Sequence, residues 1–146
     1  TEIEKEFVYE SMGIKITSIE VQHQPVEPAY GYQIYVDDKK ITYSGDTRYS
    51  INLEKASENA DYLIHEVFVS LNFDDKRMTQ DTLVNVKDYH STPEDVGTLA
   101  QKANVKKLIL NHFVPPVFDE KSLISEISQY YKGEIIVGKD LDEFIL

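Results

Sequence analysis

The stretch Ile41-Thr42-Tyr43-Ser44-Gly45-Asp46-Thr47 decides the fold. Its first residues are β-branched or aromatic, which predicts a strand, and Gly45 interrupts that pattern. Asp46 follows at once, so a carboxylate stands where the predicted strand ends. A Gly-Asp-Thr sequence alone is more typical of a simple turn, because glycine and aspartate both favour turn geometry. The rest of the chain decides between the two interpretations.

Four histidines occupy comparable places along the chain. They are His23 in Val-Gln-His-Gln-Pro, His65 in Leu-Ile-His-Glu, His90 in Tyr-His-Ser-Thr-Pro and His112 in Leu-Asn-His-Phe. Each falls at the end of a predicted strand or just ahead of a predicted helix. A lone histidine in such a place is more often structural than a ligand. Together with Asp46, however, the four imidazoles form the pattern that a zinc site needs.

The periodicity of the sequence predicts alternating strands and helices. Strands are expected over 14–23, 30–36, 41–44, 62–64, 107–110, 134–137 and 143–146, with a polar turn over 37–40. Helices are expected over 51–59 after a Ser50 cap, from a cap at Ser91 or Thr92 to 103, and over 123–131. Residues 67–89 show no sustained period and are expected to form a long loop over the site. No repeat or linker appears, so residues 1–146 are predicted to form one α/β domain.

The composition narrows the class of protein. With 146 residues and 41% hydrophobic side chains, the chain can bury a core. It has neither a signal sequence nor an apolar run of the roughly 20 residues that span a bilayer, so we expect a soluble, cytoplasmic protein with no membrane partner. The sequence begins at Thr1 rather than methionine. We therefore expect that an upstream segment is missing, and a removed signal remains an open alternative.

The net charge and the cysteine content narrow the possible partners, cross-links and catalytic groups. Fifteen basic and 26 acidic side chains give a net charge of -11, which disfavours nucleic acid as a partner. The absence of cysteine excludes disulfides and thiol nucleophiles. Histidine and carboxylate side chains are then the remaining ligands for a transition metal.

In this order the motifs resemble the C-terminal half of the metallo-β-lactamase superfamily. The segment from His23 to Ile34 resembles the strand that carries a histidine ligand of the first metal. The segment around Asp46 resembles the strand whose aspartate bridges two metals, and Leu110-Asn-His112-Phe resembles the last ligand, on the second metal. His65-Glu66 and His90-Ser91-Thr92 resemble additional signatures of the branch with ribonuclease Z, the zinc arylsulfatases and related phosphodiesterases. The resemblance covers nearly the whole chain.

The resemblance implies a fold and a reaction. The fold would be half of a four-layer αββα sandwich, a mixed sheet with helices on one face. The reaction would be hydrolysis of a phosphodiester or a sulfate ester by a metal-bound hydroxide, with two zinc ions, or other divalent metals, in the complete site. His23, Asp46 and His112 would be metal ligands. His90 would donate a proton or hydrogen bond to the substrate, and Glu66 would orient the imidazole of His90. His65 would pack beside the site.

The chain also departs from the family pattern. The principal signature of the superfamily, His-x-His-x-Asp-His, is absent. We therefore expect the isolated chain to bind metal poorly, to lack activity alone, and to pair either with the missing N-terminal half or with a second copy of itself. The interval between His23 and Asp46 has no room for the long arm of tRNA-processing members, which favours a small anionic ester. Three alternatives remain: a tRNA 3′-processing endoribonuclease, a non-catalytic half-domain that serves in assembly, and a fragment of a longer hydrolase.

Overall fold

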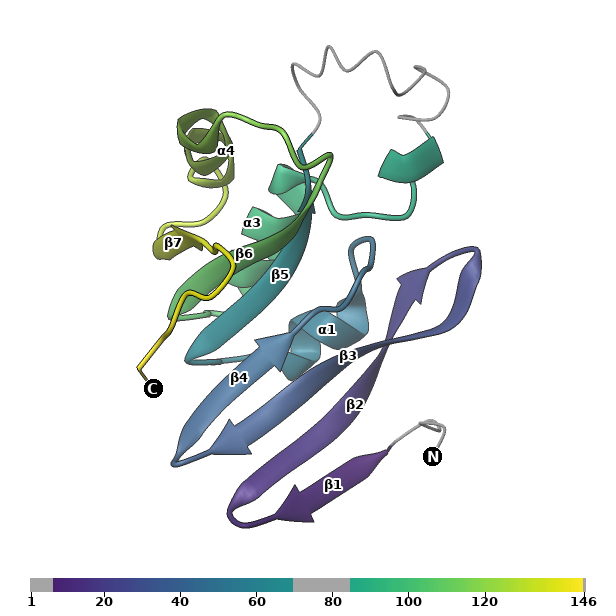
Figure 1. The fold of residues 1–146 in the computed structure, drawn as a ribbon, viewed down its shortest axis with the longest axis vertical. Coiled ribbons are helices and arrows are strands. Elements are labelled where there is room, and N and C mark those ends of the chain that lie inside the picture. Colours follow the sequence, from purple (N-terminus) through teal and green to yellow (C-terminus); the bar gives the residue numbers. More distant parts are fainter. Residues whose placement is uncertain (1–6, 70–84, 146) are drawn as a thin grey trace.

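The computed structural model describes residues 7–69 and 85–145. Within them the chain forms an α/β fold around one seven-stranded sheet, whose strands lie in the order β1-β2-β3-β4-β5-β6-β7 (Figure 1). The strands are β1 (Val8–Ser11), β2 (Ile14–His23), β3 (Val26–Val36), β4 (Lys39–Tyr43), β5 (Tyr62–Phe68), β6 (Lys107–Val114) and β7 (Glu134–Val137). The helices are α1 (Ile51–Ala56), α3 (Pro93–Lys102) and α4 (Glu120–Ile127).

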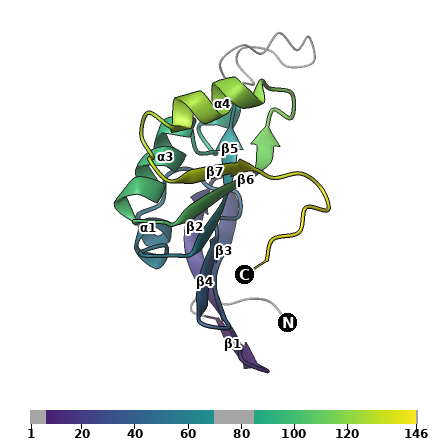
Figure 2. The ribbon, with the colours of Figure 1, turned by 90° about the vertical axis from the view of Figure 1, so that its left-hand side faces the viewer.

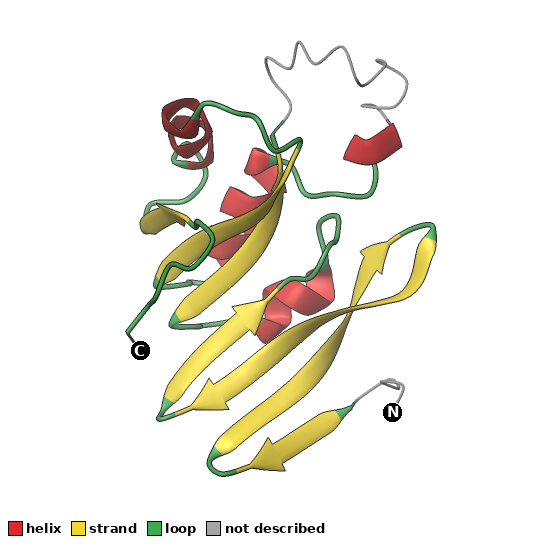
Figure 3. Cartoon of the chain, viewed as in Figure 1, coloured by secondary structure: helices red, strands yellow, loops and turns green. Residues whose placement is uncertain are grey.

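The sheet is mixed, as the family resemblance implies. Strands β1 to β4 pair antiparallel, whereas β4 to β7 pair parallel. Short turns join the antiparallel strands, and Asp37 and Asp38 take positive φ angles in the turn between β3 and β4. Parallel neighbours need a crossover connection, which α1 provides between β4 and β5 and α4 between β6 and β7. Figure 3 shows this alternation in the upper half of the molecule.

Helices α1 and α3 begin at the residues that the sequence indicates. Ser50 caps α1, and Thr92 caps α3 in a capping box with Asp95, with Pro93 in the first turn. The predicted extents were less accurate. Helix α1 ends at Ala56, and α4 begins at Glu120 after an Asp119 cap and ends at Ile127.

One face of the sheet carries the core. Figure 2 shows α1 and α3 on one side of the sheet, and the segment that follows β7 on the other. Aliphatic side chains from the strands and from helices α1, α3 and α4 pack into one buried cluster, which includes Leu53, Leu63, Leu99, Leu108 and Ile127. Because neighbouring strands pair in register, Leu63 stands beside Leu108 on the helix-covered face.

The opposite face of the sheet is apolar as well. The register aligns Tyr43, Ile64, Ile109 and Ile136 in one row across β4, β5, β6 and β7. Over the antiparallel strands a groove of about 400 Å³ lies on this face, lined by Phe7, Tyr9, Ile16, Tyr32, Ile34 and Tyr43. We call this groove and the row beside it the open face. None of the helices described above covers it.

Several strand predictions need correction. Strand β1 was not predicted, and β5 and β6 continue past the predicted ends to Phe68 and Val114. The predicted strand over 143–146 is wrong for residues 143–145, which have no regular structure. A strand needs a hydrogen-bonded neighbour, and propensity alone does not supply one. Of the loop predicted over 67–89, residues 70–84 lie outside the described residues, while 67 and 68 belong to β5.

None of the helices in the described part of the chain is long and apolar enough to cross a membrane.

His65 is a polar residue within the core. Its side chain is fully buried, and its Nδ1–H donates a 2.6 Å hydrogen bond to the carbonyl of Glu66. Its Nε2 is buried and has no hydrogen-bond partner among the described residues. Burial lowers the pKa of His65, and the nearby charges of Glu66 and Asp95 oppose that shift without reversing it. His65 is therefore neutral in the folded protein at neutral pH.

Acid should destabilise the fold through His65. Unfolded chains protonate histidine near pH 6.5, whereas the folded state resists, so the free energy of unfolding should fall by up to about 1.4 kcal/mol per pH unit below that point. Urea unfolding between pH 8 and 5 measures this. The dependence should be shallower in His65→Leu, which has no ring to protonate at this buried position. Equal slopes in wild type and His65→Leu would contradict the assignment.

Candidate functional site

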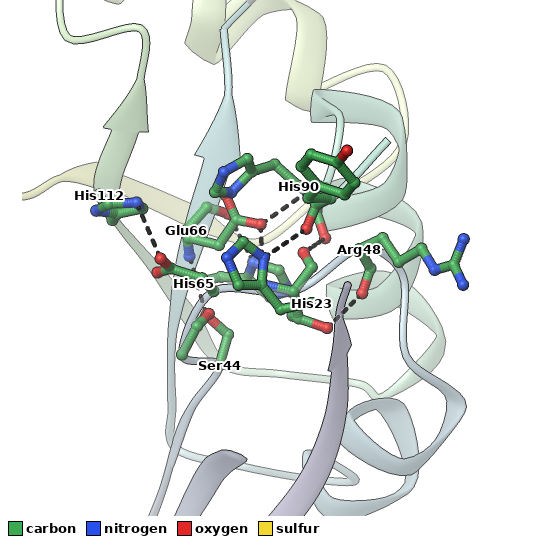
Figure 4. A network of polar contacts seen from close by, with 12 residues as sticks. His23, Ser44, Arg48, His65, Glu66, His90 and His112 are labelled. Atoms are coloured by element: carbon green, nitrogen blue, oxygen red, sulfur yellow. Dashed lines mark hydrogen bonds and ion pairs between the residues drawn. The ribbon is translucent and has the colours of Figure 1, made fainter. Parts of the chain in front are cut away.

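The polar residues singled out in the sequence gather at one edge of the sheet. The carboxyl ends of parallel strands meet at the same edge, where α/β proteins commonly bind ligands. Asp46 follows β4, Glu66 lies near the end of β5, and His112 lies near the end of β6. His23 ends β2, and His90 precedes α3. Figure 4 shows the side chains of His23, Glu66, His90 and His112 facing a common region, with His112 on one side and His23 on the other.

The carboxylate of Glu66 is the centre of the polar network. It is 1% exposed and accepts three hydrogen bonds. The backbone N–H of Ser91 donates to Oε1 at 2.8 Å, the N–H of Thr47 donates to the same oxygen at 3.3 Å, and Nδ1 of His90 donates to Oε2 at 3.1 Å. Three segments far apart in the sequence are thus joined at one buried side chain.

Further bonds hold the segments around Glu66. The Ser91 hydroxyl donates to the carbonyl of Thr47 at 2.8 Å, and the backbone N–H of Glu66 donates to the hydroxyl of Ser44 at 3.0 Å. Because Thr92 is the helix cap, Ser91 is free to make these contacts. The backbone N–H of Glu66 and the backbone carbonyl of Thr47 are therefore held by side chains that are themselves buried.

His90 is held in one orientation by this carboxylate. The ring is 8% exposed, and its Nδ1–H points to Glu66. Burial opposes protonation of the ring, but the hydrogen bond and charge of Glu66, together with the charge of Asp46, outweigh it and raise the pKa of His90 above its ordinary value. The arrangement favours an imidazole that can donate a proton or hydrogen bond.

His112 lies at an irregularity of β6. Glu66 pairs with Asn111 and Val67 with Phe113, so His112 is the extra residue of a bulge. Its φ of 41° is in the left-handed region, which non-glycine residues adopt rarely and often at functional sites. Bulges redirect side chains. Here Nε2 of His112 lies 3.3 Å from Oδ2 of Asp46.

Asp46 is placed by a close approach between two backbone segments. A Cβ on Gly31 would lie 2.6 Å from the carbonyl oxygen of Tyr43, and one on Gly45 would lie 2.5 Å from that of Tyr30. Gly45 also has a φ of 60°. Only glycine fits at these two positions. Asp46 therefore leaves β4 in a direction that depends on both residues.

His23 completes the histidine row. Its Nδ1–H donates to the carbonyl of Tyr89 at 3.1 Å, which leaves Nε2 as the acceptor nitrogen. The ring centroids of His23 and His90 are 5.1 Å apart, and those of His90 and His112 are 5.7 Å apart. The three rings therefore lie in sequence, with His90 in the middle.

Thus five of the residues singled out in the sequence come together: His23, Asp46, Glu66, His90 and His112. Their roles as ligands or catalytic groups stay predictions. His65 does not join them, because its ring is in the core. The network also uses Thr47 and Ser91, which sequence reasoning missed. They sit beside the Gly-Asp and His-Ser-Thr motifs, but no sequence signal shows that they bind Glu66.

The described residues contain no group of three or more side chains arranged to hold a metal ion. They do contain part of such a donor set. The 3.3 Å between Nε2 of His112 and Oδ2 of Asp46 is close to the separation of about 3.4 Å expected for two ligands at 2.0–2.1 Å from one tetrahedral zinc. The imidazole of His23 donates from Nδ1 to the carbonyl of Tyr89, and metal-binding histidines usually make such a bond with the ring nitrogen that does not face the metal.

Known proteins resemble the chain in sequence and in structure. Ribonuclease Z of Mycobacterium tuberculosis strain H37Rv is 28% identical over 131 residues, which are 88% of this chain and 47% of that protein. The metallo-β-lactamase fold protein YhfI from Bacillus subtilis superposes with a TM-score of 0.74 at 23% identity, over 94% of this chain and 52% of YhfI. The short form of human tRNase Z superposes with a TM-score of 0.60 at 20% identity, over 94% of this chain and 44% of that protein. The chain thus spans about half the length of these relatives.

A family model decides the assignment. The model of the β-lactamase superfamily domain matches residues 1–113. This range includes four strands of the antiparallel part of the sheet, the strand that carries Glu66, the His90 segment and most of the strand that carries His112. On the family match and the distant similarity to ribonuclease Z over most of its length, the chain belongs to the metallo-β-lactamase superfamily.

Proposed function

We propose that the chain provides one half of a metal-dependent hydrolase that cleaves a phosphodiester or sulfate ester in a small anionic substrate. The observation that carries the proposal is the position of the Glu66–His90 pair beside the Asp46–His112 pair, at the carboxyl edge of the parallel strands. One pair suits proton donation and the other suits ligation of a metal.

Asp46, His112 and His23 are the residues that would bind metal. Nitrogen and oxygen donors without cysteine suit zinc, and they also accept other divalent ions. Two bound ions would supply the nucleophile and polarise the oxygen of the bond that breaks. Because these side chains form only part of a ligand set, the remaining ligands must come from elsewhere, and the His-x-His-x-Asp-His motif of the superfamily is the source that the resemblance implies.

The chain's own residues would orient and protonate the substrate. Glu66 fixes the ring plane of His90 by accepting from Nδ1, so that the opposite nitrogen, Nε2, is the one available to the substrate. In its doubly protonated form His90 donates a proton or a hydrogen bond from Nε2 to the leaving or non-bridging oxygen. The buried negative charge of Glu66 favours that form of the ring.

A second sheet on the open face would complete the site. We propose the αββα sandwich of the superfamily, in which this chain is the C-terminal half. Two features support this: the apolar open face, and the length of the relatives, of which the chain covers 47% in ribonuclease Z and 52% in YhfI. Packed sheets lie about 10 Å apart. Side chains from the second sheet would then approach Asp46 and His112 from the open side.

Two alternatives are weaker. A tRNA 3′-processing endoribonuclease is favoured by the similarity to ribonuclease Z. Against it stand the net charge of -11 and the direct connection of β2 to β3, which pair up to His23 and Val26 and leave no room for a long arm. A non-catalytic assembly domain would not need Glu66, because a buried carboxylate costs free energy unless it is fully hydrogen-bonded.

Loss of the Glu66 carboxylate should impair proton donation. In the complete two-sheet protein, Glu66→Gln should lower kcat by roughly 100-fold, within the range that general acid catalysis contributes. His90→Ala should lower kcat to a similar extent. Because the two residues act as a unit, the double variant should be little worse than either single one. Steady-state hydrolysis of bis(4-nitrophenyl) phosphate measures this, and additive losses would contradict coupling between Glu66 and His90.

Activity should require both the second half and a metal. The 146-residue chain alone should hydrolyse aryl sulfates and bis-aryl phosphates weakly even with zinc, because its ligand set is incomplete. A second polypeptide bearing His-x-His-x-Asp-His should restore turnover, and EDTA should remove it reversibly. Asp46→Ala should abolish turnover in that complex, whereas Glu58→Ala, on the exposed surface after α1, should not. Strong zinc-dependent turnover by the monomeric chain would refute the proposal.

Without a partner sheet the chain should dimerise through the open face. Burial of the apolar groove drives association, and repulsion between surface charges is screened beyond about 8–10 Å at physiological salt. Sedimentation equilibrium at micromolar concentration should give twice the monomer mass of 16.8 kDa. Ile34→Lys, within the groove, should produce a monomer. Met12→Lys, at a site that is 94% exposed in the β1–β2 turn, should remain a dimer. A wild-type monomer would overturn this expectation.

A further inference from the structure

The segment that follows β7 lies over the open face of the sheet. It begins beside β6, where the backbone N–H of Gly138 donates to the carbonyl of Leu110 at 2.9 Å. It returns to the start of β5, where the hydroxyl of Tyr62 donates to the carbonyl of Ile145 at 3.1 Å. Figure 2 shows this segment on the side of the sheet away from α1 and α3. We call residues 139–145 the tail.

The tail does not pack closely on the sheet. Phe144 lines a gap of about 360 Å³ together with Ile64 and Ile109 of the open face. The interior of a folded protein is close-packed and contains few voids larger than a water molecule. A gap of this size therefore marks an interface that the chain does not fill by itself.

Apolar side chains also lie on the outer side of the tail. Leu141 and Ile145 are 97% and 94% exposed. Phe144 and Ile145 are consecutive, and successive side chains of an extended segment point to opposite faces. Apolar residues on both faces are typical of a strand in a sheet that is covered on both sides. The tail has this pattern, but the described part of the chain covers only one of its sides.

The backbone at the end of the tail is available for pairing. The sequence predicts a strand here, yet none of the seven described strands pairs with residues 143–145. Within the described part of the chain, the bond from Tyr62 is the one hydrogen bond that joins these residues to a strand. Exposed backbone with strand-forming side chains can add to the edge of another sheet, because the edge strand of that sheet supplies the missing hydrogen bonds.

We propose that residues 143–145 form an edge strand of the second sheet, which this chain contributes to its partner. The inference rests on the two-sheet sandwich of the proposed function and identifies a contact that joins the two halves. The tail lies on the side of the sheet where the second sheet would pack. Phe144 would remain on the open face, and side chains of the second sheet would fill the gap beside it. Ile145 would face the helices that cover the second sheet. The partner is therefore a polypeptide with a free strand edge.

Hydrogen exchange measured by NMR tests the pairing itself. In the 146-residue chain alone, the amides of Phe144 and Ile145 should exchange as fast as those of an unstructured peptide. In the complete two-sheet protein at least one of them should exchange roughly 100-fold more slowly, because an edge strand bonds through alternate residues. Ile109, on a strand paired on both sides, should be protected in both samples. Protection of the tail in the chain alone, or fast exchange of both tail amides in the complete protein, would overturn the proposal.

A charge on the outer side of the tail tests the burial of Ile145. Ile145→Asp should leave the melting temperature of the chain unchanged, because the residue is exposed there. It should weaken binding to the polypeptide that bears His-x-His-x-Asp-His by roughly tenfold or more, because a buried, unpaired charge is costly. Met12→Asp adds the same charge at an equally exposed residue in the β1–β2 turn and should bind as wild type does. Isothermal titration calorimetry measures both affinities, and equal values for the two variants would contradict the proposal.

Removal of the tail distinguishes a docking strand from an obstruction. A chain without residues 143–146 should bind the second polypeptide more weakly than wild type does. Tighter binding would show that the tail blocks the second sheet, which would refute the proposal.

Activity separates this inference from the proposed function. Turnover by a complete protein whose tail amides exchange freely would refute the docking strand and leave the hydrolase intact. Protected tail amides in a complete, metal-loaded protein that hydrolyses neither phosphodiesters nor sulfate esters would refute the hydrolase and leave the docking strand intact.

Discussion

The buried carboxylate of Glu66 is the interaction on which the rest of the site depends. It accepts hydrogen bonds from Thr47, His90 and Ser91, and so connects the loop after β4, the segment before α3 and the end of β5. A carboxylate that is 1% exposed is tolerated only when hydrogen bonds compensate its desolvation. Moving any one of the three donors away would leave the buried carboxylate incompletely hydrogen-bonded, which costs free energy, so each donor is held in its position. Removing the carboxylate would release the segments that position both His90 and Asp46.

The mixed topology explains why these groups meet. Antiparallel strands place neighbouring chain ends at opposite edges, whereas parallel strands bring successive carboxyl ends to one edge. Strands β4, β5 and β6 are parallel, so Asp46, Glu66 and His112 arrive there together. The bulge at His112, with its φ of 41°, then brings the imidazole 3.3 Å from Asp46. The strained backbone of His112 is tolerated because the residues on both sides of it are fixed by their pairing with β5.

The open face connects the proposed site to assembly. Its apolar groove and the row of Tyr43, Ile64, Ile109 and Ile136 lie on the side of the sheet away from the helices. In our proposal this face receives a second sheet, which would also bring the missing metal ligands to Asp46 and His112. Assembly and completion of the site would therefore be linked. A chain of this kind would gain its metal ligands and its covered face in one step.

The sequence by itself determined the element types, most strand positions, the helix cap at Ser50, a second cap at Ser91 or Thr92, and the set of residues that meet at the site. These features depend on local periodicity, capping chemistry and chain order, which sequence neighbours encode. Tertiary structure alone decided that the ring of His65 is fully buried, that β6 bulges at His112, and that Ser91 and Thr47 donate to Glu66. It also decided that residues 143–145 form no strand. The physical reason is that register, burial and hydrogen-bond partners are set by segments distant in sequence, and local propensity carries no information about which neighbour will be present.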